Sequence, residues 1–151
     1  MRLRNPQAGF SMAEMLIVIA FIGIAVGIGI PLVNEQVRIA EVRSSADDLA
    51  LHLRAARMIA VAKHKTIVFT VSADPTNTFS YEGNDGKMKT ITMPNRVKIA
   101  TGSDGSISFF QNGAVDAVSA VILESQVSTS LERWTATVNT VGLTTLAHVR
   151  I

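Results

Sequence analysis

Side chains that could do chemistry are few in this sequence, and they are dispersed. The three histidines lie far apart along the chain: His52, His64 and His148. No spacing typical of a metalloprotease, a serine hydrolase or a phosphate-binding loop occurs. Cysteine is absent, which excludes disulfides and thiolate metal sites. The loop acids adjoin Pro, Gly or Asn, as turn residues do, and lack the EF-hand spacing for calcium: Asp74, Asp85 and Asp104. We expect no enzyme, no cofactor and no metal.

One carboxylate has unusual surroundings. Glu14 opens an apolar run, and no ionisable side chain occurs from Met15 to Val33. A carboxylate at the edge of a membrane span is costly unless it is paired, so such a residue is a candidate for function. A local interpretation also fits, because Ser11 and Glu14 have the spacing of a capping box at a helix start. Both interpretations remain open at the level of sequence.

The apolar run itself predicts a membrane span. About 20 apolar residues are enough to cross a bilayer. Arg2 and Arg4 precede the run, and flanking basic residues favour the cytoplasmic side. A secretory signal would have a shorter apolar region and a small-residue cleavage site after it, which is missing here. We therefore expect a single-pass protein with a cytoplasmic N-terminus and its remainder in the periplasm, if the cell has two membranes.

The segment GFSMAEMLIVIAFIGI resembles the processing site of type IV pilins and pseudopilins. The matching residues are Gly9, Phe10 and Glu14, joined by Pro31 further along the apolar run. The resemblance implies that a prepilin peptidase cuts after Gly9 and methylates the new amine of Phe10. It implies that Glu14 pairs with the N-terminal amine of a neighbouring subunit and, with Pro31, serves filament assembly. Other pilins or pseudopilins and an inner-membrane assembly platform are the implied partners.

Length and charge are compatible with that interpretation. The chain has 151 residues, which suits one globular domain, and a formal net charge of +2. Without Arg2 and Arg4, twelve basic residues balance twelve acidic ones. A strong electrostatic attraction of the whole chain to nucleic acid is therefore not expected.

An amphipathic pattern continues the helix beyond the apolar run. Apolar residues recur mostly three or four positions apart, as on one helix face, at Val33, Val37, Ala40, Ala46, Leu49, Ala50, Leu53, Ala56 and Ala60. Pro31 is expected to remove a backbone hydrogen bond and to favour a kink. Gly23 and Gly27 either weaken the helix so that it melts in a filament or allow close helix packing. The helical pattern ends between Ala62 and Lys65.

Strand-like runs follow from Thr66 onward. They alternate with Gly, Asn and Asp turns and predict an antiparallel β-rich head. TFSYE and KMKTITM are predicted to form a hairpin across residues 83–86. The predicted fold is α+β and pilin-like, with the amphipathic helix packed on the head. The predicted segments are a leader (1–9), a transmembrane or filament-core helix (10–33), its amphipathic continuation (34–65) and the periplasmic head (66–151).

The head resembles the GspH/FimT group of minor pilins and pseudopilins. The matching residues are Gly105, Ile107, Phe109, Gly113, Trp134 and Gly142. Some members of that group bind DNA through a Gly-Arg-x-Arg motif, but here Gly142 precedes Leu143, Thr144 and Thr145. Weak contacts with DNA or a partner would fall to two groups of basic residues, which are Arg54, Arg57, Lys63 and Lys65 near the end of the helix and His148 and Arg150 near the end of the chain. Cations near a helix end also favour the helix dipole without any partner.

Three functional hypotheses follow from these patterns. The first is a minor pseudopilin of a type II secretion pseudopilus. The second is a minor pilin of a type IV pilus, serving assembly, adhesion or DNA uptake. The third is a single-span anchor that presents a β-rich ligand-binding module. The third predicts no cleavage after Gly9 and no effect of Glu14→Ala on assembly.

Overall fold

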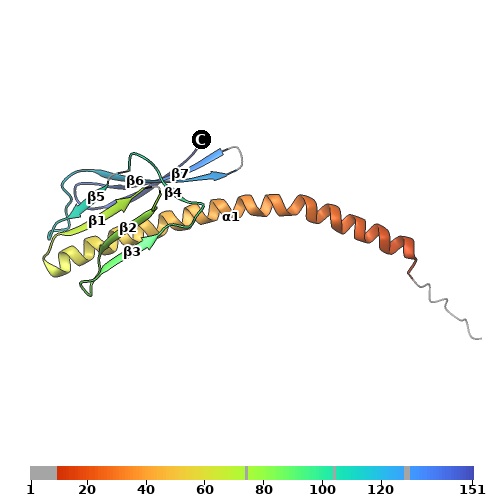
Figure 1. The fold of residues 1–151 in the computed structure, drawn as a ribbon. Coiled ribbons are helices and arrows are strands. Elements are labelled where there is room, and N and C mark those ends of the chain that lie inside the picture. The colour runs from red at the N-terminus through yellow and green to blue at the C-terminus, as the bar shows by residue number, and fades with distance from the viewer. Residues whose placement is uncertain (1–9, 74, 104, 128–129) are drawn as a thin grey trace, which may run out of the picture. The chain divides into compact units, whose positions relative to one another are not determined.

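The computed structural model describes residues 10–73, 75–103, 105–127 and 130–151, and the predicted leader lies outside them. The chain divides after Gln36 into two compact units. One helix, α1 (Met12–Lys63), contributes to both units (Figure 1). Its backbone remains helical through Pro31. The second unit, Val37–Ile151, combines the C-terminal half of α1 with all the strands.

Helix α1 ends where the sequence pattern predicts. His64 adopts a left-handed backbone conformation with φ of 50°. The Lys65 amide donates to the Ala60 carbonyl and the His64 amide donates to the Val61 carbonyl. This is the Schellman arrangement, which satisfies carbonyls left open at a helix end.

Within the described residues, eight strands form two antiparallel sheets. The first has the order β3-β2-β1-β5, from β1 (Ile67–Ser72), β2 (Thr78–Glu82), β3 (Met88–Thr92) and β5 (Ser106–Phe109). The second has the order β4-β6-β7-β8, from β4 (Lys98–Ile99), β6 (Ser119–Val127), β7 (Ser130–Val138) and β8 (Thr144–Arg150). The predicted hairpin is confirmed, because β2 pairs antiparallel with β3. The α+β fold class is also confirmed.

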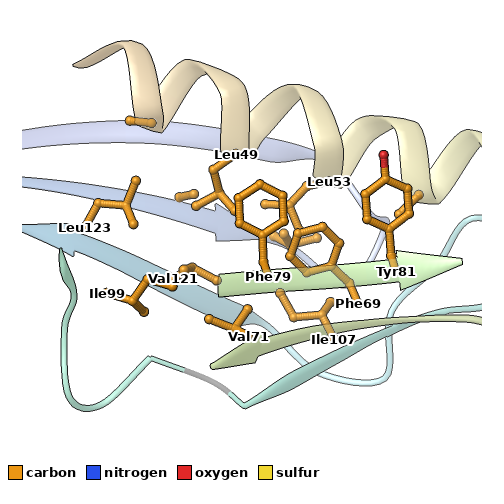
Figure 2. Packing of buried hydrophobic residues seen from close by; sticks show 14 of the residues in the cluster. Leu49, Leu53, Phe69, Val71, Phe79, Tyr81, Ile99, Ile107, Val121 and Leu123 are labelled. Carbon is orange, nitrogen blue, oxygen red and sulfur yellow. The ribbon is translucent and has the colours of Figure 1, made fainter. Parts of the chain in front are cut away.

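The core of the second unit lies between α1 and the inner faces of the sheets. Residues of α1 three and four positions apart are fully buried there: Val42, Ala46, Leu49, Leu53, Ala56 and Ala60. Figure 2 shows Leu49 and Leu53 directed from the helix toward Phe79 and Phe69 of the first sheet. The rings of Phe69 and Phe79 stack with centroids 5.2 Å apart. The small alanines on this face let the helix backbone approach the sheets closely.

The buried stripe on α1 begins later than the apolar pattern indicates. Val33 and Val37 are 62% and 41% exposed, and full burial begins at Val42 among the described residues that follow Val33. Val37 lines an open groove with Met93 and Pro94, which follow β3. Periodicity identifies which face of a helix is apolar, but only the packed strands decide where along its length that face is covered.

Candidate assembly surface

The N-terminal half of α1 presents an uncovered apolar surface. From Met12 to Ile28 its large apolar side chains are each at least 45% exposed, and they include Met12, Leu16, Ile19, Phe21, Ile24 and Ile28. The helix is long and apolar enough to cross a membrane by length and composition. Soluble monomers rarely expose apolar patches beyond a few hundred square ångströms. This surface therefore needs lipid or other helices to cover it.

The start of α1 is capped by Ser11. The Ser11 hydroxyl accepts from the Ala13 amide at 3.3 Å, and its carbonyl accepts from the Glu14 amide at 3.0 Å. Ser11 is thus the N-cap of α1, as the capping interpretation of the sequence predicts. Glu14 is exposed in the first turn, where a negative charge favours the helix dipole. Its pairing with a neighbour's amine stays a prediction, and Gly9 lies outside the described residues.

Gly23 and Gly27 in this segment face open space, where another helix could contact them. A side-chain carbon built at Gly23 or Gly27 would meet nothing within 4 Å. These positions offer flat sites on the helix surface. Both predictions for them, local melting and close helix packing, remain open.

In the head, a buried carboxylate joins two of the predicted basic residues. Glu132 on β7 is 1% exposed. Its Oε2 lies 2.5 Å from Nε2 of His148, and its Oε1 lies 3.1 Å from Nε of Arg150. His148 also stacks on Trp134 with centroids 4.7 Å apart. The register explains this cluster, because β7 and β8 pair Glu132 with Arg150 and Trp134 with His148.

Sequence reasoning missed Glu132. Side chains alternate between the two faces of a strand, and Glu132 lies on the same face of β7 as the core residues Ala136 and Val138. This alternation is the feature of the sequence that indicates burial of Glu132. A carboxylate on the inner face of a strand requires a cation or donor nearby. That requirement points to the neighbouring strand, which supplies His148 and Arg150.

The remaining basic residues of the predicted contact set are placed along the end of α1. Arg57 donates through Nε to the Gly113 carbonyl at 3.0 Å and through Nη2 to the Val141 carbonyl at 3.1 Å. The Lys63 ammonium donates to the Asn84 carbonyl, and Lys65 pairs with Glu82 at 2.6 Å. Arg54 is exposed. The contacts of Arg57, Lys63 and Lys65 are thus with two turns, the Asn84 carbonyl and Glu82, whereas His148 and Arg150 share Glu132.

Four of the residues on which the head resembles the GspH/FimT group have structural roles, either in the core or in turns. Ile107 and Phe109 are buried in the core. Gly113 and Gly142 lie against Arg57, where added side-chain carbons would come within 3.1 Å and 2.7 Å of its Nε. Arg57 thus joins the helix to two turns that only glycine permits.

No cluster of three or more His, Asp or Glu that could hold a metal occurs within the described residues. His52 instead contacts Tyr81, with Nδ1 2.8 Å from the hydroxyl. Burial, and to a lesser extent the charge of Lys89, lower the pKa of His52 against an opposing effect of Asp48. Burial raises the pKa of Tyr81. Asp85 caps its own turn by accepting from the Lys87 amide, whereas Asp74 and Asp104 lie outside the described residues.

The comparison with solved structures shows what kind of fold the chain has. No family model and no curated protein matches this sequence. Among solved structures, the chain is similar to the minor pseudopilin EpsH from the type 2 secretion system of Vibrio cholerae. The TM-score is 0.53 at 14% identity, over 72% of this chain and 96% of that one. With its long apolar N-terminal helix and antiparallel sheets, the chain has a pseudopilin-like fold.

Proposed function

We propose that this chain is a minor pseudopilin of a type II secretion system, made as a membrane-inserted precursor and assembled into a short periplasmic filament. The observation that carries the proposal is the uncovered apolar half of α1 in a chain with a pseudopilin-like fold. An apolar helix without cover requires lipid before assembly and neighbouring helices after it. The chain acts by assembly, and no substrate bond is broken.

The proposed assembly step depends on the processed N-terminus. Cleavage after Gly9 by prepilin peptidase would create a free amine on Phe10, and methylation keeps its positive charge. An α-amino group is largely protonated near neutral pH. Glu14 of one subunit would pair with that cation on its neighbour, because a carboxylate among apolar side chains requires a counter-charge. The pair would set the axial position of each subunit on the assembly platform.

The test combines recovery of partners with sequencing of the N-terminus. The tagged protein is cross-linked in its own membranes, purified, and analysed by mass spectrometry. We expect a chain that begins at methylated Phe10 and is joined to pseudopilins of the secretion system. The same N-terminus joined to pilus subunits would assign the chain to a type IV pilus instead. An uncut chain in a cell with active prepilin peptidase would contradict the proposal and favour the anchored module.

Two matched variants test the role of Glu14. Glu14→Gln removes the proposed counter-charge, and Asp47→Asn removes one exposed acid elsewhere on the same helix. We expect the first to abolish recovery of the protein in purified filaments and the second to leave it unchanged. Equal recovery of both variants would exclude the Glu14–amine pair.

A further inference from the structure

We propose that a basic pocket in the head binds the phosphate of an anionic membrane lipid. The pocket is lined by Arg38, Arg96 and Lys98, together with Glu124, Gln126 and Leu131, and has a volume of about 440 Å³. The inference rests on the proposed function only in requiring that the chain is anchored in a membrane. It adds a ligand to a part of the molecule that the assembly proposal does not use.

The three cations come from separate parts of the second unit. Arg38 lies on α1, Arg96 lies in the segment between β3 and β4, and Lys98 opens β4. Arg38 is held in place because its Nη1 donates to the Gln126 carbonyl at 3.2 Å. Folding therefore gathers three positive charges that are up to 60 positions apart in the sequence.

Three cations and one acid line the pocket, so cations outnumber acids in its wall. Glu124, the acid among the lining residues, accepts from Arg133 at 2.7 Å and 2.6 Å through a single oxygen. Arg133 thus adds a fourth cation beside Glu124, which also lies opposite Lys98 in the pairing of β4 with β6. The Glu41 carboxylate lies 3.6 Å from Arg96, which is beyond hydrogen-bond distance. Arg96 keeps donors for a ligand, and its side chain is 51% exposed.

The chemistry of the pocket suits a phosphate group. Guanidinium groups offer paired N–H donors that match phosphate oxygens, and an ammonium adds a point charge. A pocket lined by two arginines and one lysine is therefore suited to bind a singly charged phosphodiester. Leu131 adds an apolar side to the pocket, against which a glycerol backbone would pack.

The position of Arg38 in the chain favours a lipid over a soluble phosphate. Arg38 follows Val33, the last residue of the apolar run, by five residues. Five residues span at most about 18 Å even when fully extended, so the distance limit holds for any angle between the two units. A membrane-embedded run thus keeps Arg38 near the lipid headgroups. Tethering makes this encounter effectively intramolecular.

The experiment measures which lipid the full chain retains. The purified chain in micelles with equal amounts of phosphatidylglycerol and phosphatidylcholine is examined by native mass spectrometry. We expect a strong preference for phosphatidylglycerol in the unmodified protein. Each basic residue near an anionic surface contributes roughly fivefold, so loss of three predicts a decrease on the order of 100-fold. The variant that tests this is Arg38→Gln with Arg96→Gln and Lys98→Gln.

The matched control removes the same number of charges elsewhere. Arg54→Gln with Lys87→Gln and Lys89→Gln alters three exposed cations outside the pocket. We expect this control to keep the preference. Arg96→Gln alone, at an exposed position, should lose about fivefold. Thermal unfolding followed by circular dichroism checks that each variant is folded.

Three outcomes would overturn the proposal. The first is unchanged lipid preference in the pocket variant, and the second is an equal loss in the control. The third is displacement of the lipid by millimolar inorganic phosphate, which would identify a soluble anion as the ligand. Because the assay uses the purified chain, it stands even if cleavage after Gly9 or filament assembly fails.

Discussion

At the scale of single residues, the end of α1 shows why two turns of the head contain glycine. Gly142 has φ of 76°, and an added side-chain carbon would lie 2.0 Å from the Gly113 carbonyl oxygen. The Arg57 side chain fills the remaining space, 2.7 Å from the same position. Two separate constraints, a left-handed backbone and a close backbone approach, thus act on one residue.

Gly142→Ala should therefore destabilise the head strongly. The left-handed conformation costs an ordinary residue about 1–2 kcal/mol, and the backbone clash adds to it. Gly86→Ala is the matched control, because Gly86 has φ of 78° and its nearest atom lies 4.0 Å away. Urea unfolding followed by Trp134 fluorescence compares the two free energies of unfolding. Equal losses of unfolding free energy in the two variants would mean that the close approach of Gly113 to Gly142 contributes nothing to the effect.

His52 gives the head a pH-dependent contribution to stability. Its pKa is lowered in the folded state, so the unfolded chain binds more protons as the pH falls below 6.5. The contribution is fully present above pH 6.5 and is lost as the pH falls from there through the folded-state pKa. His52→Gln keeps a hydrogen-bonding group near Tyr81 but cannot titrate. We expect the slope of unfolding free energy against pH, measured between pH 5 and 7, to decrease in this variant.

At the scale of elements, α1 packs on the sheets through a face of small residues. Ala56 is fully buried within the core, whereas Ala62 on the same helix is exposed. The pairing of strands fixes the position of the sheets, so the helix cannot retreat freely from a larger side chain. The alanines therefore set the distance between helix and sheets.

Ala56→Leu should destabilise the head through overpacking, by about 1–3 kcal/mol. Ala62→Leu introduces the same side chain at an exposed position and should change stability little. Thermal unfolding monitored by circular dichroism distinguishes the two. Similar melting temperatures for both variants would show that the helix face accommodates added volume.

At the scale of the whole molecule, the division after Gln36 separates two kinds of surface. The second unit contains the complete apolar core and both sheets. The described part of the first unit exposes its large apolar side chains from Phe10 to Ile28. A compact unit with its own core is expected to fold without the rest of the chain.

A fragment of residues 37–151 should therefore be soluble, folded and monomeric. Its far-ultraviolet circular dichroism should show helix and strand, and its unfolding should be cooperative. The full chain should require detergent, because the apolar half of α1 lacks cover. Analytical ultracentrifugation of the fragment checks its oligomeric state. Aggregation of the fragment, or a full chain that stays soluble without detergent, would contradict this division.

Local sequence patterns were enough to predict most of the elements. The helix end near Lys63 and the β2–β3 hairpin follow from periodicities and turn residues that lie within a few positions of each other. The apolar run from Met15 to Val33 likewise determines that this part of α1 requires lipid or protein cover. The helix end, the hairpin and the apolar run depend on residues close together in the sequence, so they can be predicted without a structure.

Contacts between distant segments were decided only by the tertiary structure. The division of the strands into two sheets, the pairing of buried Glu132 with His148 and Arg150, and the pocket around Arg38 depend on strand order and register. Arg57 likewise contacts turns 56 and 84 positions away. No local pattern specifies such partners, because many strand orders bury the same apolar faces. The packed core selects one of them, and that choice places the charged residues.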